Sequence, residues 1–241
     1  MKSNLRVFFI IYQWLIAFPV LLVLTILTAV LTTILSPLFP NSSFSYYPAR
    51  WWGKAFCYLL FIRLKVRGLE NLNPEQSYVF TLNHQSIFDI FVIYGWLPPI
   101  FKWIMKAELR RIPLVGKACE AAGHIFIDRT NPMAAKRSLE NAESQLKSGV
   151  SVVVFPEGTR TYTGQLGPFK RGAYRIAADL SLPVVPVTIR GSFERLHRNS
   201  LNVHPGKIEM IIHSPIEVAD FLPDGTNDLI QKTREMIQSA L

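Results

Sequence analysis

The apolar residues of the chain are most concentrated near its N-terminus, in a run without any charged side chain from residue 7 to residue 35. Gln13 and scattered threonines interrupt this run, and Pro19 lies within it. About 20 apolar residues suffice to cross a bilayer core, whereas a signal peptide has an apolar stretch of roughly 7 to 15. The length therefore disfavours a signal peptide. Two arrangements stay open: a spanning helix, or a helix pair that dips into one leaflet, kinked at Pro19 and completed by residues 51–62.

From residue 64 onward, short runs of β-forming residues alternate with helical patterns. The predicted strands are residues 64–67, 78–82, 125–127, 151–155, 184–189 and 207–212. Such alternation predicts an α/β fold, here a mixed sheet flanked by helices, with an N-terminal membrane-embedded helix or helix pair.

Two helices and one linker complete this pattern. Asn131 suits a helix N-cap, Pro132 the first helical position and Gly149 the C-terminal cap, and apolar residues between them form one stripe. A final helix is predicted over residues 227–240. Residues 37–48, rich in Pro, Ser, Asn and aromatics, are predicted as a bend or linker. We expect membrane-anchoring helices and linker over residues 1–62 and an α/β domain over residues 63–241.

The charges suggest an anionic partner and an orientation. The 241 residues carry a formal net charge of +9, which suits either nucleic acid or anionic lipid headgroups, and the apolar segment favours lipid. Two cations precede that segment and five follow it, so the positive-inside rule places the domain in the cytoplasm. Five aromatic residues lie near the expected interfaces: Trp14, Tyr46, Tyr47, Trp51 and Trp52. Cys57 and Cys119 have no metal-ligand spacing and predict neither a metal site nor a disulfide framework.

The most informative polar residues are His84 and Asp89, just after the predicted strand 78–82. In an unbroken helix they would lie about 140° apart around the axis and could not meet. If His84 lies in the loop and Asp89 in the first helical turn, the carboxylate can hold one ring nitrogen while the other acts as a base. The alternative is that Asp89 merely caps a helix, because Ser86 and Asp89 have the spacing of a capping box.

Two further strand ends carry arginine. The run 151–155 leads into a turn with Glu157, Gly158, Thr159 and Arg160, where the guanidinium could bind phosphate and the glycine allows close backbone approach. The run 125–127 is followed by Asp128 and Arg129. A surface turn with a structural ion pair is the alternative for residues 156–160.

More cations surround residues 108–113. They are Lys102, Lys106, Arg110, Arg111 and Lys117, with Lys170 and Arg171 further along. Such a cluster is typical of a solvated face, and its size also suggests an anionic substrate or headgroup. The chain lacks the G-x-S-x-G elbow, the H-E-x-x-H zinc helix and the glycine-rich phosphate loops, and neither Cys lies beside a His in sequence. A covalent nucleophile is therefore not evident, which favours direct activation of a substrate hydroxyl by His84.

Four ordered segments resemble the motifs of the glycerolipid acyltransferases. They are residues 83–89 (NHQSIFD), 123–129 (GHIFIDR), 155–160 (FPEGTR) and 182–187 (LPVVPV). The match is best to 1-acylglycerol-3-phosphate acyltransferases and covers roughly residues 64–218. The first and third motifs, in this order and spacing, are highly specific.

The resemblance implies transfer of a fatty acyl chain from acyl carrier protein or coenzyme A to the sn-2 hydroxyl of lysophosphatidic acid, giving phosphatidic acid. It implies no cofactor beyond the acyl thioester as co-substrate, no metal and no nucleic acid, with membrane lipids as partners. By position, His84 would be the general base and Asp89 its orienting partner. The implied substrate-binding residues are Arg129, Glu157, Gly158, Thr159 and Arg160, with Lys106 as a weaker candidate for phosphate or oxyanion contact.

Three other functions remain as alternatives. An acyltransferase for another lysophospholipid would use the same motifs. A thioester hydrolase would use His84 to activate water. A non-catalytic basic membrane protein would not require the His84–Asp89 spacing.

Overall fold

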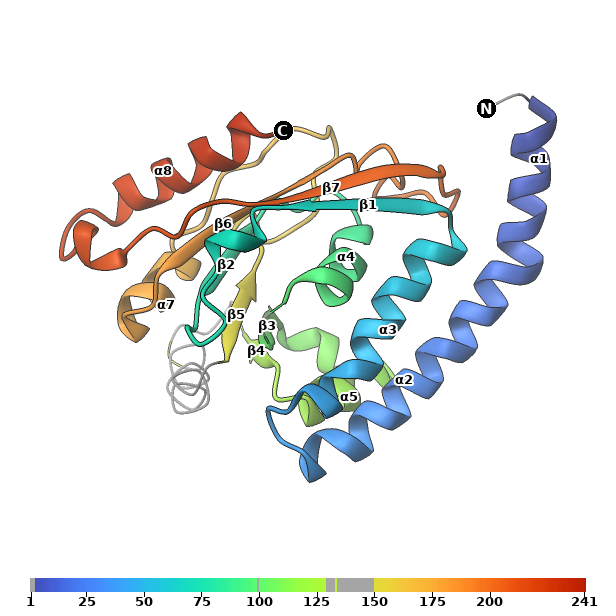
Figure 1. Cartoon of the computed structure of the whole chain (residues 1–241), viewed down its shortest axis with the longest axis horizontal. Coiled ribbons are helices and arrows are strands. Elements are labelled where there is room, and N and C mark those ends of the chain that lie inside the picture. Colours follow the sequence, from blue (N-terminus) through green and yellow to red (C-terminus); the bar gives the residue numbers. More distant parts are fainter. Residues whose placement is uncertain (1–2, 99, 129–132, 134–149) are drawn as a thin grey trace.

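The computed structural model describes residues 3–98, 100–128, 133 and 150–241 of the chain. Within that part, seven strands form one sheet in the order β1-β7-β6-β2-β5-β3-β4, with helices on both of its faces (Figure 1). Their bounds are β1 Ile62–Arg67, β2 Val79–Leu82, β3 Phe101–Lys106, β4 Ile125–Ile127, β5 Ser151–Val154, β6 Val184–Arg190 and β7 Gly206–Ile212. All neighbours pair in parallel except β6 and β7, which are antiparallel. The predicted mixed α/β sheet is therefore confirmed.

The helices of the described part divide between the two faces of the sheet. They are α1 Ser3–Tyr12, the π-helix η1 Gln13–Ala17, α2 Phe18–Leu38, α3 Ser43–Leu59, α4 Phe88–Trp96, α5 Val115–Ala121, α7 Gly172–Leu180 and α8 Thr226–Ser239, with short 3-10 turns at Leu69–Asn71, Ala107–Arg111 and Val218–Phe221. The predicted C-terminal helix is thus confirmed within one residue at each end. The helix predicted between Asn131 and Gly149 lies outside the described residues.

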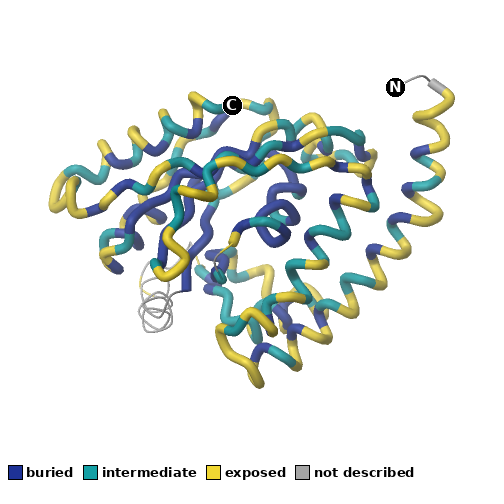
Figure 2. The backbone as a smooth tube through the Cα atoms, viewed as in Figure 1, coloured by how far each residue is buried: buried dark blue, intermediate teal, exposed yellow. Residues whose placement is uncertain are grey.

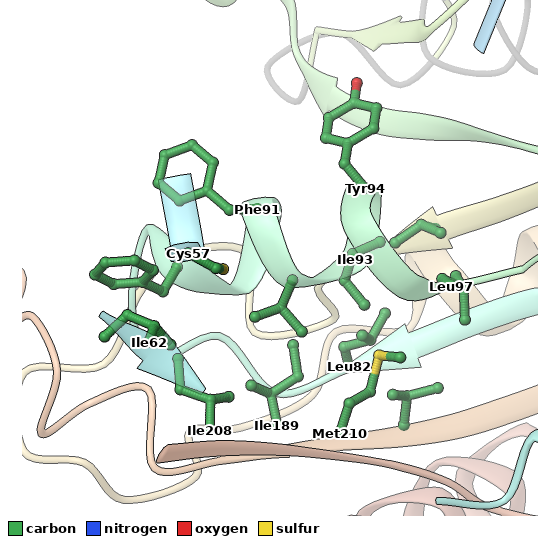
Figure 3. Close-up of a cluster of buried hydrophobic side chains, with 14 of the residues drawn as sticks. Cys57, Ile62, Leu82, Phe91, Ile93, Tyr94, Leu97, Ile189, Ile208 and Met210 are labelled. Atoms are coloured by element: carbon green, nitrogen blue, oxygen red, sulfur yellow. The ribbon is translucent and has the colours of Figure 1, made fainter. Parts of the chain in front are cut away.

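The central strands are buried on both faces because α/β packing covers both. Phe80 of β2 faces the core under α4, whereas its neighbour Val79 faces the core under α7. The same alternation separates Val153 from Val152 in β5. Figure 3 shows the first of these cores, with side chains of α4 lying over β6 and β7. This packing fixes α4, whose first turn carries Asp89.

Six of the seven strands coincide with predicted runs, and β3 does not. Two lysines, Lys102 and Lys106, interrupt its apolar residues, so the sequence suggests a cluster of surface cations here and not a strand. In the structure Lys102 is only 8% exposed, and its Nζ donates a hydrogen bond to the Ala122 carbonyl at 2.6 Å. Burial lowers the Lys102 pKa to about 8. The interpretation of the cation cluster as a solvated face is therefore wrong for Lys102.

The N-terminal apolar run forms a helix over Asn4–Leu38 that is, by length and composition alone, long and apolar enough to cross a membrane. It follows the flank of the α/β unit, and α3 returns beside α2 (Figure 1). Many of its large apolar side chains are exposed, as the yellow stretches along these helices show in Figure 2. The helix therefore packs through one face and leaves an apolar face uncovered.

The chain reverses between α2 and α3, at residues 39–42, and not at Pro19. Pro19 lies inside the continuous helix Asn4–Leu38, two residues after the π-helix η1, and both a proline and a π-helical turn are common causes of a local bend in a helix. The predicted linker 37–48 is also shorter than expected, because α3 already begins at Ser43. Tyr46 packs edge-on against Phe101 at 5.4 Å between ring centroids, and this tertiary packing overrides the weak helix propensity of the segment.

Gln13 shows that the apolar helix is docked at a defined place. Its side chain is fully buried, Nε2 donates to the Leu201 carbonyl at 2.8 Å, and Oε1 accepts from the Val203 N–H at 2.9 Å. A buried amide that satisfies two backbone groups fixes register as well as contact. The N-terminal helix is thereby fixed to the loop between β6 and β7.

Candidate active site

The site lies at one edge of the sheet, where the chain leaves three neighbouring parallel strands. β2 ends just before His84, β5 ends just before Phe155, and β6 leads into the loop of residues 191–205. The carboxyl ends of parallel strands meet at one edge, which is where α/β proteins bind their ligands.

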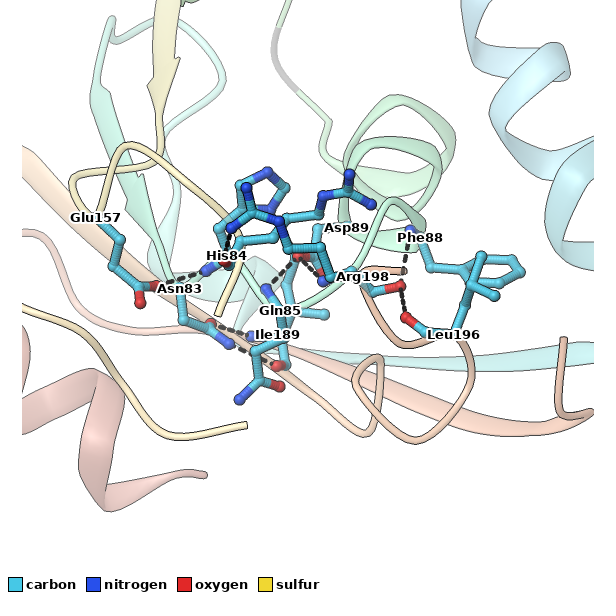
Figure 4. A network of polar contacts seen from close by, with 11 residues as sticks. Asn83, His84, Gln85, Phe88, Asp89, Glu157, Ile189, Leu196 and Arg198 are labelled. Carbon is cyan, nitrogen blue, oxygen red and sulfur yellow. Dashed lines mark hydrogen bonds and ion pairs between the residues drawn. The ribbon is translucent and has the colours of Figure 1, made fainter. Parts of the chain in front are cut away.

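His84 and Asp89 are brought together as predicted. His84 Nδ1 lies 2.9 Å from Asp89 Oδ2, with the ring in the loop after β2 and the carboxylate in the first turn of α4 (Figure 4). The Asp89 side chain is fully buried, and that of His84 is 13% exposed. Among the described residues, no hydrogen-bond partner lies at His84 Nε2, and the ring borders the cavity described below. The arrangement leaves one nitrogen available to a ligand.

Asp89 also has the capping role that was the alternative interpretation of its spacing from Ser86. Its Oδ2 accepts from the backbone N–H groups of Gln85 at 2.7 Å and Ser86 at 2.9 Å. The Ser86 hydroxyl lies 3.4 Å from the Phe88 N–H. One carboxylate oxygen therefore orders the loop, starts the helix and holds the imidazole.

The imidazole is also fixed through its faces and its backbone. It stacks on the Phe155 ring, with centroids 3.8 Å apart and planes 9° from parallel. The His84 carbonyl accepts from the Thr161 N–H at 2.9 Å, and its N–H donates to Glu157 Oε1 at 2.7 Å. The segment after β5, residues 155–161, thus holds this residue in place.

Glu157 lies where it can position His84, and both oxygens of its carboxylate accept hydrogen bonds from backbone N–H groups. Besides Oε1, which accepts from His84, Oε2 accepts from the Gly167 N–H at 2.8 Å. Burial raises the pKa of the Glu157 carboxyl group. The geometry supports a role in ordering the loop of residues 156–167 around His84, and the substrate contact expected from sequence stays a prediction.

Glu157→Ala is expected to lower the free energy of unfolding by about 1–3 kcal/mol for each backbone N–H left without an acceptor. Glu157→Gln should cost less, because its amide oxygen still accepts one of the two bonds. Urea unfolding measures both, with Glu194→Ala, an exposed glutamate, as the control. Equal stability of Glu157→Ala and the unchanged protein would show that neither bond matters.

The other candidate binding residues of the described part line the cavity. Gly158, Thr159 and Arg160 line it, and so does Lys106 from the end of β3. Gly158 has a φ of +74°, a left-handed turn that favours glycine. Burial, followed by the nearby charge of Arg198, lowers the Arg160 pKa. Arg129 lies outside the described residues.

The cavity has a volume of about 980 Å³ and runs between α2, α3, α4, β3 and α5. Its wall includes the apolar side chains of Ile87, Ile90, Ile104, Met105, Leu109 and Ile112. His84 lies on the same wall as these aliphatic groups. The space thus suits an aliphatic chain whose reactive end lies beside an imidazole.

A second histidine on the cavity wall, His124, is unsuited to act as a base. Its Nδ1 accepts from the Trp103 N–H at 3.2 Å, and its Nε2 lies 2.7 Å from the Tyr94 hydroxyl. Burial, with a smaller contribution from Lys102, lowers its pKa to about 3. Both nitrogens are used within the protein, which leaves His84 as the candidate base.

Sequence reasoning missed Arg198, which also lines the cavity. Its Nη1 donates to the Arg160 carbonyl at 2.8 Å, and its guanidinium lies over the Tyr162 ring at 4.2 Å. It lies eight residues beyond the end of β6, after Arg190 and Arg195, so the pattern of arginines at strand ends does not distinguish it.

Comparison with known proteins gives the family. The family model described as Acyltransferase matches residues 63–190. The chain belongs to this Acyltransferase family. The two segments that resemble acyltransferase motifs, residues 83–89 and 155–160, are in contact in the structure through His84, Phe155 and Glu157.

Named relatives agree with this assignment. The chloroplastic 1-acyl-sn-glycerol-3-phosphate acyltransferase BAT2 of Brassica napus is 34% identical over 198 residues, 80% of this chain and 57% of that protein. The human 1-acyl-sn-glycerol-3-phosphate acyltransferase alpha is 35% identical over 178 residues, 73% of this chain and 63% of that protein. The chain thus spans about three fifths of the length of these relatives.

A solved acyltransferase structure matches over nearly its whole length. The crystal structure of PlsC from Thermotoga maritima, a 1-acyl-sn-glycerophosphate (LPA) acyltransferase, has a TM-score of 0.78 and 27% identity. The match covers 100% of this chain and 96% of that one. The similarity therefore includes the N-terminal helices as well as the sheet.

Proposed function

We propose that the protein transfers a fatty acyl chain from an acyl thioester to the sn-2 hydroxyl of 1-acyl-glycerol-3-phosphate, giving phosphatidic acid. The observation that carries this proposal is the His84–Asp89 pair, whose imidazole, held at Nδ1, borders a cavity with aliphatic walls that Arg160 also lines. The names of the relatives support the acceptor.

The chemistry follows from the pair. His84 Nε2 takes the proton of the acceptor hydroxyl as its oxygen forms a bond to the thioester carbonyl carbon. The carbon–sulfur bond then breaks, and the leaving thiolate takes the proton back from the imidazole. Asp89 keeps the proton on Nδ1 and stabilises the transient imidazolium, because the two lie 2.9 Å apart.

The acceptor is held by charge and by turn geometry in this proposal. Arg160 binds the phosphate, Gly158 allows close approach of the glycerol backbone, and the Thr159 hydroxyl offers a hydrogen bond. Lys106 and Arg129 remain further proposed contacts. Positioning of this kind contributes strongly, since effective molarities in well-oriented reactions reach on the order of 10⁵ M or more.

The N-terminal helices place the cavity at the membrane in this proposal. Their uncovered apolar face, with Phe8, Leu15 and Leu22 among its exposed side chains, enters the cytoplasmic leaflet. Because α2 and α3 also line the cavity, its contents lie next to lipid. The acyl chains of acceptor and product then need not cross water.

The test is an assay of the full chain in lipid vesicles with 1-acyl-glycerol-3-phosphate and a matched pair of donors, acyl carrier protein and coenzyme A thioesters of one chain length. We expect phosphatidic acid to form with at least one donor, and free fatty acid to stay at background. Acyl release that is equal with and without acceptor would indicate a thioester hydrolase. Faster turnover of another lysophospholipid would assign a different acceptor.

A further inference from the structure

Arg198 is a charged residue of the cavity wall that has no role in the proposed mechanism so far. It lies in the loop of residues 191–205 between β6 and β7. Figure 4 draws it together with His84 and Asp89, and its half-buried side chain borders the cavity next to Arg160.

The loop that carries Arg198 is fixed on both sides of this residue. Before it, the Leu196 carbonyl accepts from the Ser86 hydroxyl at 2.8 Å. After it, Leu201 and Val203 bond to the buried amide of Gln13. The loop is therefore held to the His84 segment and to the N-terminal helix, so the place of Arg198 is set before any ligand binds.

The guanidinium itself is oriented by two contacts. Nη1 donates to the Arg160 carbonyl, and the central carbon, Cζ, lies over the Tyr162 ring, 4.2 Å from its centroid. One of its five N–H groups is accounted for in this way. Stacking on an aromatic ring leaves the edge of a guanidinium free to bind an anion.

Two like charges meet here without a close counterion. Among the ion pairs of the described residues none joins Arg160 or Arg198 to a carboxylate within 4.0 Å, and, after burial, the charge of Arg198 lowers the Arg160 pKa. Asp89 exerts a weaker opposite influence on Arg160, and its Oδ2 is engaged by His84. Partly buried cations that repel each other favour a ligand with two negative charges.

We propose that Arg198 binds the acceptor's phosphate together with Arg160 and thereby selects a terminal phosphate monoester over a phosphodiester headgroup. The inference rests on the proposed function and names a specificity determinant for it. A monoester carries up to two negative charges and three terminal oxygens, enough for two guanidinium groups. A diester carries one charge, and its second substituent occupies the place of an oxygen that Arg198 would bind.

The experiment compares two acceptors, 1-acyl-glycerol-3-phosphate and lysophosphatidylglycerol, in vesicles with one acyl donor. For Arg198→Ala we expect the KM for the monoester to rise by about 10- to 100-fold, the size of one lost charge-assisted hydrogen bond. The ratio of kcat/KM for monoester over diester should fall by a similar factor. Because a ratio does not depend on the amount of folded enzyme, it separates binding from partial unfolding.

Arg195→Ala is the matched control from the same loop. Its guanidinium donates to the carbonyls of Gly191 and Pro205, so its loss disturbs the loop without removing a cavity cation. An acceptor ratio that is unchanged in Arg198→Ala, or that falls equally in Arg195→Ala, would overturn the inference. If Arg198→Ala is too slow to measure, the same ratio is read from Arg198→Gln, which keeps an N–H donor. Failure of the unchanged enzyme to make phosphatidic acid would instead count against the proposed function.

Discussion

Replacing His84 with alanine is expected to lower kcat for phosphatidic acid formation by on the order of 10²- to 10⁴-fold, the usual contribution of a general base. The fold should survive, because the contacts that tie this residue to Glu157 and Thr161 use its backbone N–H and carbonyl, which alanine keeps. The variant lacks the imidazole, and with it the stacking on Phe155 and the hydrogen bond to Asp89. The KM for the acceptor should change little.

The measurement is initial-rate kinetics at saturating donor, with thermal unfolding as the check on the fold. His197→Ala is the matched control, since that exposed imidazole packs against Phe193 in a neighbouring loop. Near-normal turnover in His84→Ala would remove the base from the proposed mechanism. The same loss in both variants would point to a general disturbance of the site.

The His84–Asp89 pair was predictable because its evidence is local. The apolar run 78–82 fixes where a strand ends, and the capping spacing of Ser86 and Asp89 fixes where a helix begins, so the turn between them follows. Most strands were predictable for a similar reason, since a buried central strand such as Ser151–Val154 has a nearly continuous apolar sequence.

The remaining features depend on contacts between distant residues. Gln13 counts as a polar interruption in an apolar run, and its partners Leu201 and Val203 lie about 190 positions away. The strand β3 could not be recognised from the sequence, because the burial of Lys102 depends on a hydrogen bond to the distant Ala122 carbonyl. No periodicity encodes such pairings, which arise only when the strands assume their order in the sheet.

Glu157 illustrates a different limit. Its place in a motif beside Arg160 suggests that both side chains face the same ligand. In the structure the Glu157 carboxylate turns to backbone N–H groups of two other segments, while Arg160 lines the cavity. Adjacent functional residues can thus serve the ligand and the scaffold separately, and sequence spacing does not distinguish these roles.

Asp89→Asn is expected to lower kcat by on the order of 10²- to 10⁴-fold with a smaller loss of stability than Asp89→Ala, because rate and stability depend on different properties of this side chain. The asparagine oxygen can still accept from the N–H groups of Gln85 and Ser86. It is neutral, however, and cannot stabilise an imidazolium at His84. Alanine removes the acceptor too and should cost about 1–3 kcal/mol for each N–H left unpaired.

The double variant His84→Ala, Asp89→Asn distinguishes an orienting carboxylate from an independent contribution. If Asp89 acts through the imidazole, its replacement should cause little further loss once His84 is absent, since residues that act as one unit are strongly non-additive. Initial rates of the two single variants and the double variant, with urea unfolding of Asp89→Asn and Asp89→Ala, give the complete comparison. Near-normal kcat in Asp89→Asn would reduce the carboxylate to a helix cap, and fully multiplicative losses would give it a role apart from His84.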